Sequence, residues 1–289
     1  MQFKLYIDIN EFYHVTYDLL MCHEAQNLIP LGNIMMGKEG KDKSEWRDPA
    51  NWLMATVSED NVIQLVALMT PPHGITLYAK DNKIDETAMA CLISGISDIP
   101  IPGVVARIDI ALCFAQAYCS AKGIAYETSM EQRIYELTKV NPNIPNIGTI
   151  RLAEENDMYF LPYWLEAMYT VIERHDKTTM NIPQEAEAFL YKIAQKKIYL
   201  LEDDGKPVSM AATSRELQTI CGIAVVYSPP YFRRKGYATS CVAKLSQMVL
   251  DRGFSKCVLY TDLANPTSNS IYQKIGYHPV CDSVMLKFV

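Results

Sequence analysis

The stretch RRKGYA, from Arg233 to Ala238, decides the interpretation of this chain. It follows the apolar run TICGIAVVYSPP (219–230), typical of a buried strand, and precedes CVAKLSQMVLDRG (241–253), whose apolar residues have helical spacing. The first N–H groups of a helix have no partner within it, and the helix dipole adds partial positive charge there. Gly236 lets the main chain approach a ligand closely, and three cations precede it. We therefore predict that this turn binds a pyrophosphate.

Two other kinds of nucleotide-binding turn are excluded, because the sequence lacks the residues that they require. A nucleotide P-loop would end in Gly-Lys-Ser/Thr, and a dinucleotide fingerprint would need three glycines where only Gly236 is present. A solvated loop with a turn glycine stays open on these six residues alone.

The composition of the chain is that of an ordered globular protein. Of its 289 residues, 49% are hydrophobic and 21% are charged, and no low-complexity tract occurs. The net charge of -6 argues against a nucleic-acid partner, because binding to phosphates requires a basic face.

Cysteine usage and the N-terminus indicate the compartment. The eight cysteines stand singly, with no CxxC pair and no zinc-type Cys/His spacing, so we expect reduced thiols and no metal. The start MQFKLYIDINEF lacks the pattern of a signal peptide, and no apolar run reaches the length of a membrane span. These features predict a cytoplasmic protein without a membrane partner.

Two domains are expected, residues 1–142 and 148–289, because VNPNIPNIG (140–148) interrupts all periodicity. Residues 148–289 read as a short strand, two helices, two or three strands joined at the tight turn EDDGKP, a helix, a strand, a short helix and a final strand. This order predicts an α/β fold with a mixed central sheet flanked by helices.

The first domain is harder to interpret. Its periodicity predicts two helices, three strands, two helices on either side of PGVVA, and a last strand in TSMEQRIYELTKV. Because this order of elements echoes the second half, we expect two structurally similar halves without an obvious sequence repeat.

Two motifs carry a family resemblance that covers roughly Ile150 to Val289. RRKGYA resembles motif A of the GNAT superfamily of N-acetyltransferases, Arg/Gln-x-x-Gly-x-Gly/Ala, with Arg233, Gly236 and Ala238 at its fixed places. NPTSNSIYQKIGY (265–277) is similar to motif B of the same superfamily. The whole chain also resembles a bacterial subgroup with a divergent N-terminal half.

The resemblance implies a GNAT-type fold and acetyl-coenzyme A as cosubstrate. In the family, this ligand lies where two parallel strands diverge. The pantetheine arm would then pair with the backbone of the strand before the turn, and the pyrophosphate would rest on the turn itself. The implied binding residues are Val226, Tyr227, Ser228, Arg233, Arg234, Lys235, Gly236, Tyr237, Ala238, Thr239 and Asn265.

The resemblance also implies Tyr272 as the general acid that protonates the departing thiolate. Its alternative role is an aromatic packed on the sheet. Asn265 could cap a turn as well as bind pantetheine, and Ser268 is expected to cap the helix that carries Tyr272. No motif identifies a general base.

Several further side chains are weak candidates for a general base or a nucleophile. Asp262 is expected to brace its loop, Glu216 is a weaker candidate base, and His175 is expected to be a surface residue. Cys221 could be a nucleophile, but buried packing is the favoured interpretation.

The first half is not expected to bind coenzyme A. The segment at the place of the anion turn is KDNKIDETA (80–88), which contains no glycine. For the whole chain, the family resemblance implies an N-acetyltransferase that uses a small-molecule or peptide amine by direct transfer in a ternary complex. A non-catalytic acyl-coenzyme A-binding or sensing module is the alternative, and the acceptor and the oligomeric state, a homodimer included, stay open.

Overall fold

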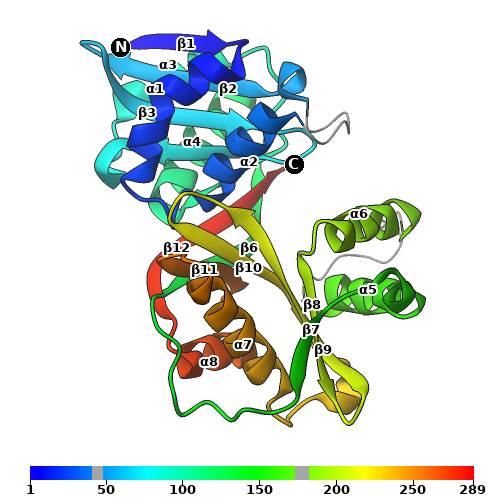
Figure 1. Cartoon of the computed structure of the whole chain (residues 1–289). Helices are drawn as coiled ribbons and strands as arrows, with labels where there is room; N and C mark the ends of the chain where they lie inside the picture. Colours follow the sequence, from blue (N-terminus) through cyan, green and yellow to red (C-terminus); the bar gives the residue numbers. More distant parts are fainter. Residues whose placement is uncertain (41–47, 173–181) are drawn as a thin grey trace. The chain divides into compact units, whose positions relative to one another are not determined.

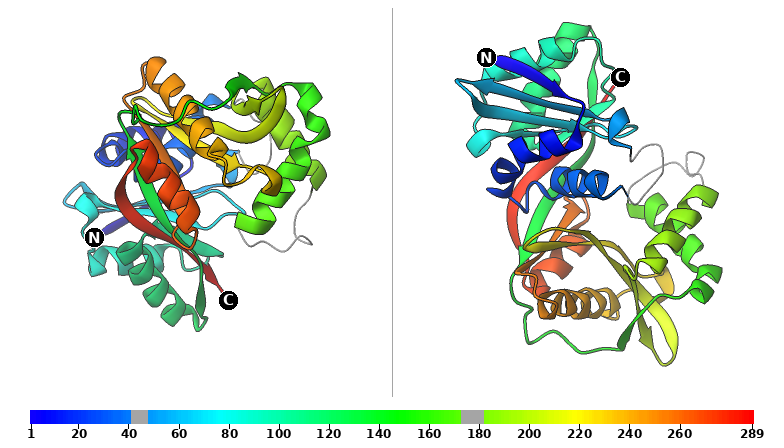
Figure 2. Two further views of the ribbon diagram at one scale, coloured as in Figure 1. Left: turned by 90° about the horizontal axis from the view of Figure 1, so that it is seen from below. Right: turned by 45° about the horizontal axis from the view of Figure 1, so that its top comes forward.

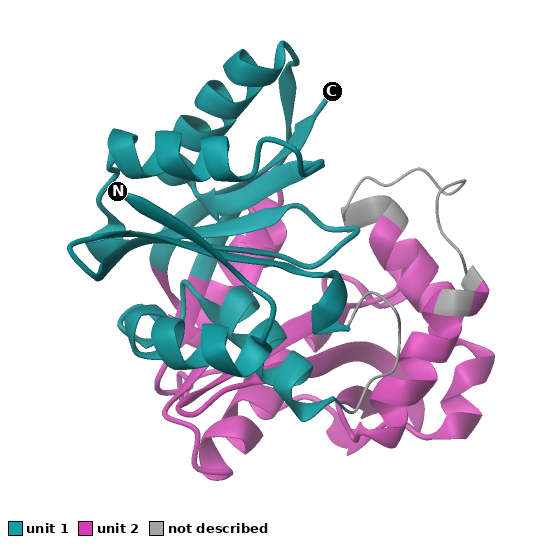
Figure 3. Cartoon of the chain, turned by 90° about the horizontal axis from the view of Figure 1, so that it is seen from above, with its two compact units in different colours: residues 1–134, 280–289 teal, residues 135–279 magenta. Residues whose placement is uncertain are grey.

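The computed structural model of the chain describes residues 1–40, 48–172 and 182–289 (Figure 1). By its internal contacts the chain divides into two compact units, one of residues 1–134 with 280–289 and one of residues 135–279 (Figure 3). The expected boundary at 142–148 differs from this division, which assigns residues 135–147 to unit 2 and the last ten residues to unit 1. The difference arises because two strands, β6 (Tyr126–Leu137) and β12 (His278–Phe288), each run from one unit into the other.

Unit 1 begins with a strand and two helices, continues with three strands, and then alternates helices and strands. Its elements are β1 (Gln2–Tyr6), α1 (Ile9–Met21), α2 (Leu28–Glu39), β2 (Leu53–Glu59), β3 (Val62–Met69), β4 (Ile75–Ala79), α3 (Glu86–Gly95), β5 (Gly103–Arg107), α4 (Ile108–Lys122) and β6 (Tyr126–Leu137). The strand order is β1-β2-β3-β4-β5-β12-β6. Within it, β4 and β5 pair in parallel, whereas the pairs β1–β2, β2–β3, β3–β4 and β12–β5 are antiparallel.

Unit 2 has the same order of elements. They are β7 (Thr149–Leu152), α5 (Leu161–Ile172), α6 (Ile182–Ala194), β8 (Ile198–Asp203), β9 (Lys206–Glu216), β10 (Ile220–Tyr227), α7 (Tyr237–Asp251), β11 (Lys256–Asp262), α8 (Pro266–Ile275) and β12 (His278–Phe288). Each half therefore reads strand, two helices, three strands, helix, strand, helix, strand, and apart from the first strand of unit 1 this order agrees with the similarity of the two halves expected from the periodicity. The first strand, β1, is an element that the sequence patterns did not predict.

The sheet of unit 2 is covered on both faces, and alternation along its strands explains why. Tyr199 and Leu201 of β8 pack with α7 and α8, whereas Ile198 and Leu200 pack with α5 and α6. The two helix pairs can be followed on either side of the strands in Figures 1 and 2. Strands buried on both faces are expected to be rich in apolar residues, and β10 is such a strand.

The predicted hairpin between β8 and β9 is present. Asp203 pairs with Lys206, and the two residues between them, Asp204 and Gly205, have φ angles of 51° and 69°. A two-residue turn with both φ angles positive suits the right-handed twist of the strands, which is why Asp-Gly is favoured there. No helix in the described ranges is long and apolar enough to cross a membrane.

Candidate active site

Strands β10 and β11 run in parallel and pair over a short distance. The register joins Ile220–Gly222 to residues 256–258, and Gly222 opposite Val258 is the last pair among the described residues. Beyond Gly222, β10 continues for five residues to Tyr227. Beyond Gly222, the edge of β10 that faces β11 therefore no longer pairs with that strand.

The free part of β10 contains a β-bulge. Ala224 pairs with Ala212 of β9 and Tyr227 pairs with Met210, so β10 has one residue more than β9 over this interval. Val225, within the bulge, has a φ of 55°. Such a conformation is a strained one for a β-branched residue, and strain of this kind is concentrated at functional sites.

The three residues expected to pair with pantetheine differ in what they already bind. Val226 lies in the bulge, outside the regular register of β9 and β10. The carbonyl of Tyr227 accepts a hydrogen bond of 3.0 Å from Ser209 Oγ, and the carbonyl of Ser228 accepts one of 3.0 Å from Arg233 Nε. Val226 is thus the residue of the three best suited to offer its backbone to a ligand.

The turn after β10 presents a row of unpartnered amides. Arg233 N donates to Pro230 O at 3.2 Å, and the next amide with an acceptor is Ser240 N, which donates to Gly236 O at 2.9 Å. Within the described part of the chain, the amides of residues 234–239 have no acceptor. Because a helix dipole points its positive end at the same place, the turn is suited to an anion.

The backbone of the turn requires glycine at one position. Gly236 is the N-cap of α7 and has a φ of 82°, and a Cβ built on it would lie 3.2 Å from Ile147 Cδ1. Arg234 has a φ of 62°. Residues that alternate between helical and left-handed conformations form concave amide nests, and these bind phosphate oxygens.

The cations of the turn have different surroundings. Arg233 is held by the loop, since its Nε donates to Ser228 O and its guanidinium lies 5.7 Å from the centre of the Tyr227 ring. Lys235 Nζ lies 5.1 Å from the centre of the exposed Tyr231 ring. Arg234 is exposed. Arg233 is therefore engaged in shaping the loop, and Arg234 and Lys235 remain able to turn toward an anion.

Two contacts from outside the motif fix the start of α7. Tyr237 Oη donates to Asp203 Oδ2 at 2.5 Å, and this bond raises the pKa of Tyr237. Ser240 Oγ donates to Ile147 O at 2.7 Å. Asp203 and Ile147 were not predicted as parts of the site, because each lies more than thirty residues from its partner and no local pattern marks it.

Tyr272 lies on the seventh residue of α8, within the core between the sheet and helices α7 and α8. Its ring is 7% exposed and lies edge-on to the ring of Tyr277, with 5.9 Å between the centroids. Burial raises the pKa of Tyr272. No hydrogen-bond partner of its hydroxyl occurs among the described residues. A neutral phenol with a spare proton is what a general acid requires.

The cap of α8 differs from the expectation. Asn265 is the N-cap residue, and its Oδ1 accepts a hydrogen bond of 3.1 Å from Ser268 N. The expectation that Ser268 caps this helix was wrong, because Pro266 occupies the first helical position and places the cap one residue before it. A role of Asn265 toward pantetheine remains a prediction.

The candidate bases are engaged in structural bonds. Asp262 Oδ1 accepts from Ala264 N at 2.7 Å, which is the bracing role expected of it. Both oxygens of Glu216 accept from Arg252 Nη2, at 3.0 and 3.1 Å. His175 lies outside the described residues.

Cys221 is fully buried, and burial raises the pKa of its thiol to about 12. The thiolate is the reactive form of cysteine, so the geometry favours packing over nucleophilic attack. In the described ranges, no three side chains of the metal-binding types stand together.

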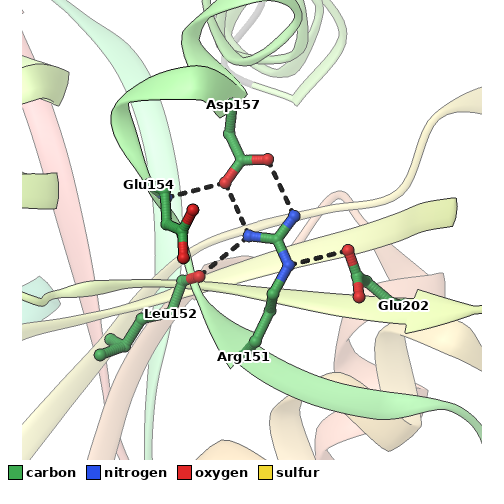
Figure 4. Close-up of polar contacts among 5 residues, drawn as sticks. All are labelled: Arg151, Leu152, Glu154, Asp157 and Glu202. Atoms are coloured by element: carbon green, nitrogen blue, oxygen red, sulfur yellow. Dashed lines mark hydrogen bonds and ion pairs between the residues drawn. The ribbon is translucent and has the colours of Figure 1, made fainter. Parts of the chain in front are cut away.

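One ion-pair cluster holds the first strand of unit 2, β7, to the short 3-10 helix Glu155–Tyr159 and to strand β8 (Figure 4). Arg151 of β7 donates from Nη1 and Nη2 to the two oxygens of Asp157, at 2.7 and 2.9 Å, and from Nε to Glu202 of β8 at 2.8 Å. Asp157 also accepts from Glu154 N at 2.8 Å. Burial opposes ionisation of Asp157, but the bonds from Arg151 outweigh it and lower its pKa. Arg151, Asp157 and Glu202 each have an oppositely charged partner within the cluster, which indicates a structural role.

Unit 1 has different residues at the positions that correspond to the turn and to Tyr272 of unit 2. At the start of α3, Asp85 accepts hydrogen bonds from Thr87 N and Ala88 N, at 2.9 and 3.0 Å. A carboxylate thus occupies the position that an anion would take, and it would repel one. The seventh residue of α4, equivalent to Tyr272 in α8, is the buried Phe114, which has no hydroxyl.

The strand before that turn differs as well. Two residues beyond the last parallel pair, β4 has Tyr78, where β10 has Ala224. Tyr78 is 1% exposed, its hydroxyl lies 2.7 Å from His23 Nδ1, and burial raises its pKa to about 12. These differences support the prediction that unit 1 does not bind coenzyme A as unit 2 would.

Comparisons with known proteins agree with the geometry. The model of the acetyltransferase (GNAT) family matches residues 147–277. No curated protein matches the chain significantly in sequence.

Solved structures share the fold over the whole chain. An acetyltransferase from the GNAT family of Colwellia psychrerythraea has 9% identity and a TM-score of 0.56, covering 100% of this chain and 99% of that one. A GCN5-related N-acetyltransferase from Sphaerobacter thermophilus has 13% identity and a TM-score of 0.62, covering 99% and 95%. A tandem GNAT protein from the clavulanic acid biosynthesis pathway has 10% identity and a TM-score of 0.57, covering 100% and 98%. The expected two-domain GNAT arrangement is thereby confirmed.

Proposed function

Because residues 147–277 belong to the GNAT acetyltransferase family, we propose that this chain moves an acetyl group from acetyl-coenzyme A to a primary amine. The transfer is direct, within a ternary complex of protein, acetyl-coenzyme A and amine. The observation that carries the proposal is the row of unpartnered amides at residues 234–239, placed directly after a strand whose parallel partner has diverged.

The residues of the turn fit the diphosphate of the cosubstrate. The amides of residues 234–239 supply donors, and Gly236 leaves room that a side chain would fill. Arg234 and Lys235 add positive charge from exposed positions. Hydrogen bonds between donors and an ionised phosphate are about twice as strong as neutral ones, so such a cradle contributes substantially to affinity.

The chemical step follows from the nature of a thioester. The free amine attacks the carbonyl carbon, the C–S bond breaks, and the sulfur leaves as a thiolate that needs a proton. We assign that proton to the hydroxyl of Tyr272, which burial keeps neutral and which has no competing partner among the described residues. The amine must also lose a proton to a base. Asp262 and Glu216 are poor candidates for this base, because each already accepts a hydrogen bond within the protein.

The same engagement of the carboxylates favours a second candidate function, a module that binds acyl-coenzyme A without turnover. An amine screen with detection of free thiol separates the two, run alongside calorimetric binding of coenzyme A. An enzyme releases thiol with at least one small-molecule or peptide amine, and Tyr272→Phe removes most of that release at unchanged coenzyme affinity. Binding without thiol release from any amine would favour the sensor, and the absence of binding would refute both functions.

A further inference from the structure

Asn269, on the fourth residue of α8, uses its whole amide group within the protein. Its Nδ2 donates to Asp262 O at 2.9 Å and to Asn265 O at 2.8 Å, and its Oδ1 accepts from Tyr135 Oη at 3.1 Å. Asp262 is the last residue of β11, and Asn265 is the cap of α8. One side chain therefore ties the helix to the strand end that precedes it.

Tyr135 forms a second attachment of this helix. It lies on β6, is fully buried, and accepts a hydrogen bond of 3.2 Å from Gln273 Nε2 in addition to the one it donates to Asn269. The rings of Tyr135 and Tyr272 are tilted neighbours, with 6.4 Å between their centroids. Two successive turns of α8 are thus bonded to a single phenol on the sheet.

We propose that Asn269 and Tyr135 are positioning residues that set the place of the Tyr272 hydroxyl relative to the cosubstrate. This inference rests on the proposed function. The Tyr272 hydroxyl has no protein partner among the described residues, so its position is determined by the helix that carries it and by ring packing. The start of the helix in turn is held by the two carbonyls and the phenol that Asn269 binds. Its C-terminal end is held separately, by hydrogen bonds from Asn141 to the carbonyls of Lys274 and Ile275.

The consequence for catalysis is specific. A proton donor acts only within hydrogen-bond reach of the atom that it protonates, and a displacement of about 1 Å can lower a rate about 100-fold. The pyrophosphate turn belongs to α7, and neither Asn269 nor Tyr135 contacts it in the bonds described. Loss of these bonds should therefore reduce turnover and leave coenzyme binding unchanged.

The decisive variant is Asn269→Asp, which keeps the shape of the side chain. It replaces the Nδ2 donor by an oxygen that faces the carbonyls of Asp262 and Asn265, and it retains the acceptor for Tyr135. We expect kcat to fall about tenfold or more, with KM and the dissociation constant of acetyl-coenzyme A within about threefold of the wild type. Tyr135→Phe should act in the same direction but less, because the exposed Gln273 can bond to water instead.

A double-mutant cycle separates positioning from a general loss of stability. In a Tyr272→Phe background, Asn269→Asp should lower kcat by less than about threefold, because there is no hydroxyl left to misplace. Tyr6→Phe is the matched control, since it removes another buried phenol bond, 3.0 Å to Thr56 Oγ1, in unit 1. It should leave kcat unchanged.

Equal losses of kcat in both backgrounds, or a loss of coenzyme affinity as large as the loss of kcat, would overturn the proposal. If the wild type turns over no amine, the proposed function fails by itself, and amide hydrogen exchange of residues 266–275 then decides the inference. Exchange about tenfold faster in Asn269→Asp, with α7 unaffected, would support the attachment of α8. Unchanged exchange would overturn it.

Discussion

Replacing Gly236 by alanine tests the anion turn at the position where the backbone is most demanding. Gly236 has a φ of 82°, a conformation that costs an alanine about 1–2 kcal/mol relative to glycine. Without ligand, the variant turn can relax to a negative φ, and the amides of residues 234–239 then leave their common orientation. Binding of the diphosphate must restore that orientation at the same cost. The contact of the new Cβ with Ile147 Cδ1, at 3.2 Å, adds to it.

A cost of about 1–2 kcal/mol corresponds to a dissociation constant about 5–30 times higher. Isothermal titration with coenzyme A measures this change, and titration with pantetheine, which lacks the diphosphate, should show none. Gly123→Ala is the matched control, because Gly123 ends α4 of unit 1 with a φ of 68° and open space around its Cβ. It should lower the unfolding temperature in a similar way without any change in coenzyme affinity.

Two results would refute this reasoning. If Gly236→Ala binds coenzyme A as tightly as the wild type, the turn does not hold the diphosphate in the conformation described. If pantetheine and coenzyme A lose affinity equally, the substitution acts through the fold of unit 2 and not through the amide row.

Three further predictions follow from single side chains. Tyr272→Phe should lower turnover about 100-fold or more, the lower end of general-acid effects, and wild-type turnover should persist beyond pH 10 in a pH–rate profile, because the raised pKa keeps the phenol protonated there. Asp85→Ala should destabilise the protein by about 1 kcal/mol in thermal unfolding, through loss of a helix cap, yet calorimetry should reveal no second coenzyme site. The pKa of Asp157 is lowered in the folded state, so its contribution to the free energy of unfolding is complete at neutral pH. That contribution is lost as the pH falls below about 4 toward the lowered pKa. Asp157→Asn should therefore make the stability less dependent on pH in this range, as measured by acid unfolding.

The parts of the fold that could be predicted are those whose signals are local. Apolar residues at helical spacing mark α1 to α8 in their correct order, and the Asp204-Gly205 pair marks the hairpin. The anion turn is local as well, since Gly236 and its cations follow one another directly. Such features depend on neighbours in the chain, so a short window of sequence contains them.

Other parts carried no readable signal. Strand β1 is only five residues long, and its polar–apolar alternation from Gln2 to Leu5 is too short to distinguish a strand, the more so because most of its residues are exposed at the edge of the sheet. The bulge at Val225 lies in the run IAVVY, which reads as an uninterrupted strand, because a positive φ at valine leaves no mark in the sequence. Partners such as Tyr135 and Asn269 are 134 residues apart, so that only the fold brings them together.

The two units have similar folds but differ at one helix start. Both have the same order of elements, and in each a parallel strand pair ends shortly before a helix start. At that helix start, unit 2 has Gly236 with free amides, whereas unit 1 has Asp85 with its carboxylate on them. In unit 1 the carboxylate thus takes the place of the open donors, and it would repel an anion. The two units share the order of their elements, so this difference comes from the residues at the helix start. If the proposed function holds, the capacity to bind a diphosphate belongs to a few backbone groups and one glycine, and the fold alone does not provide it.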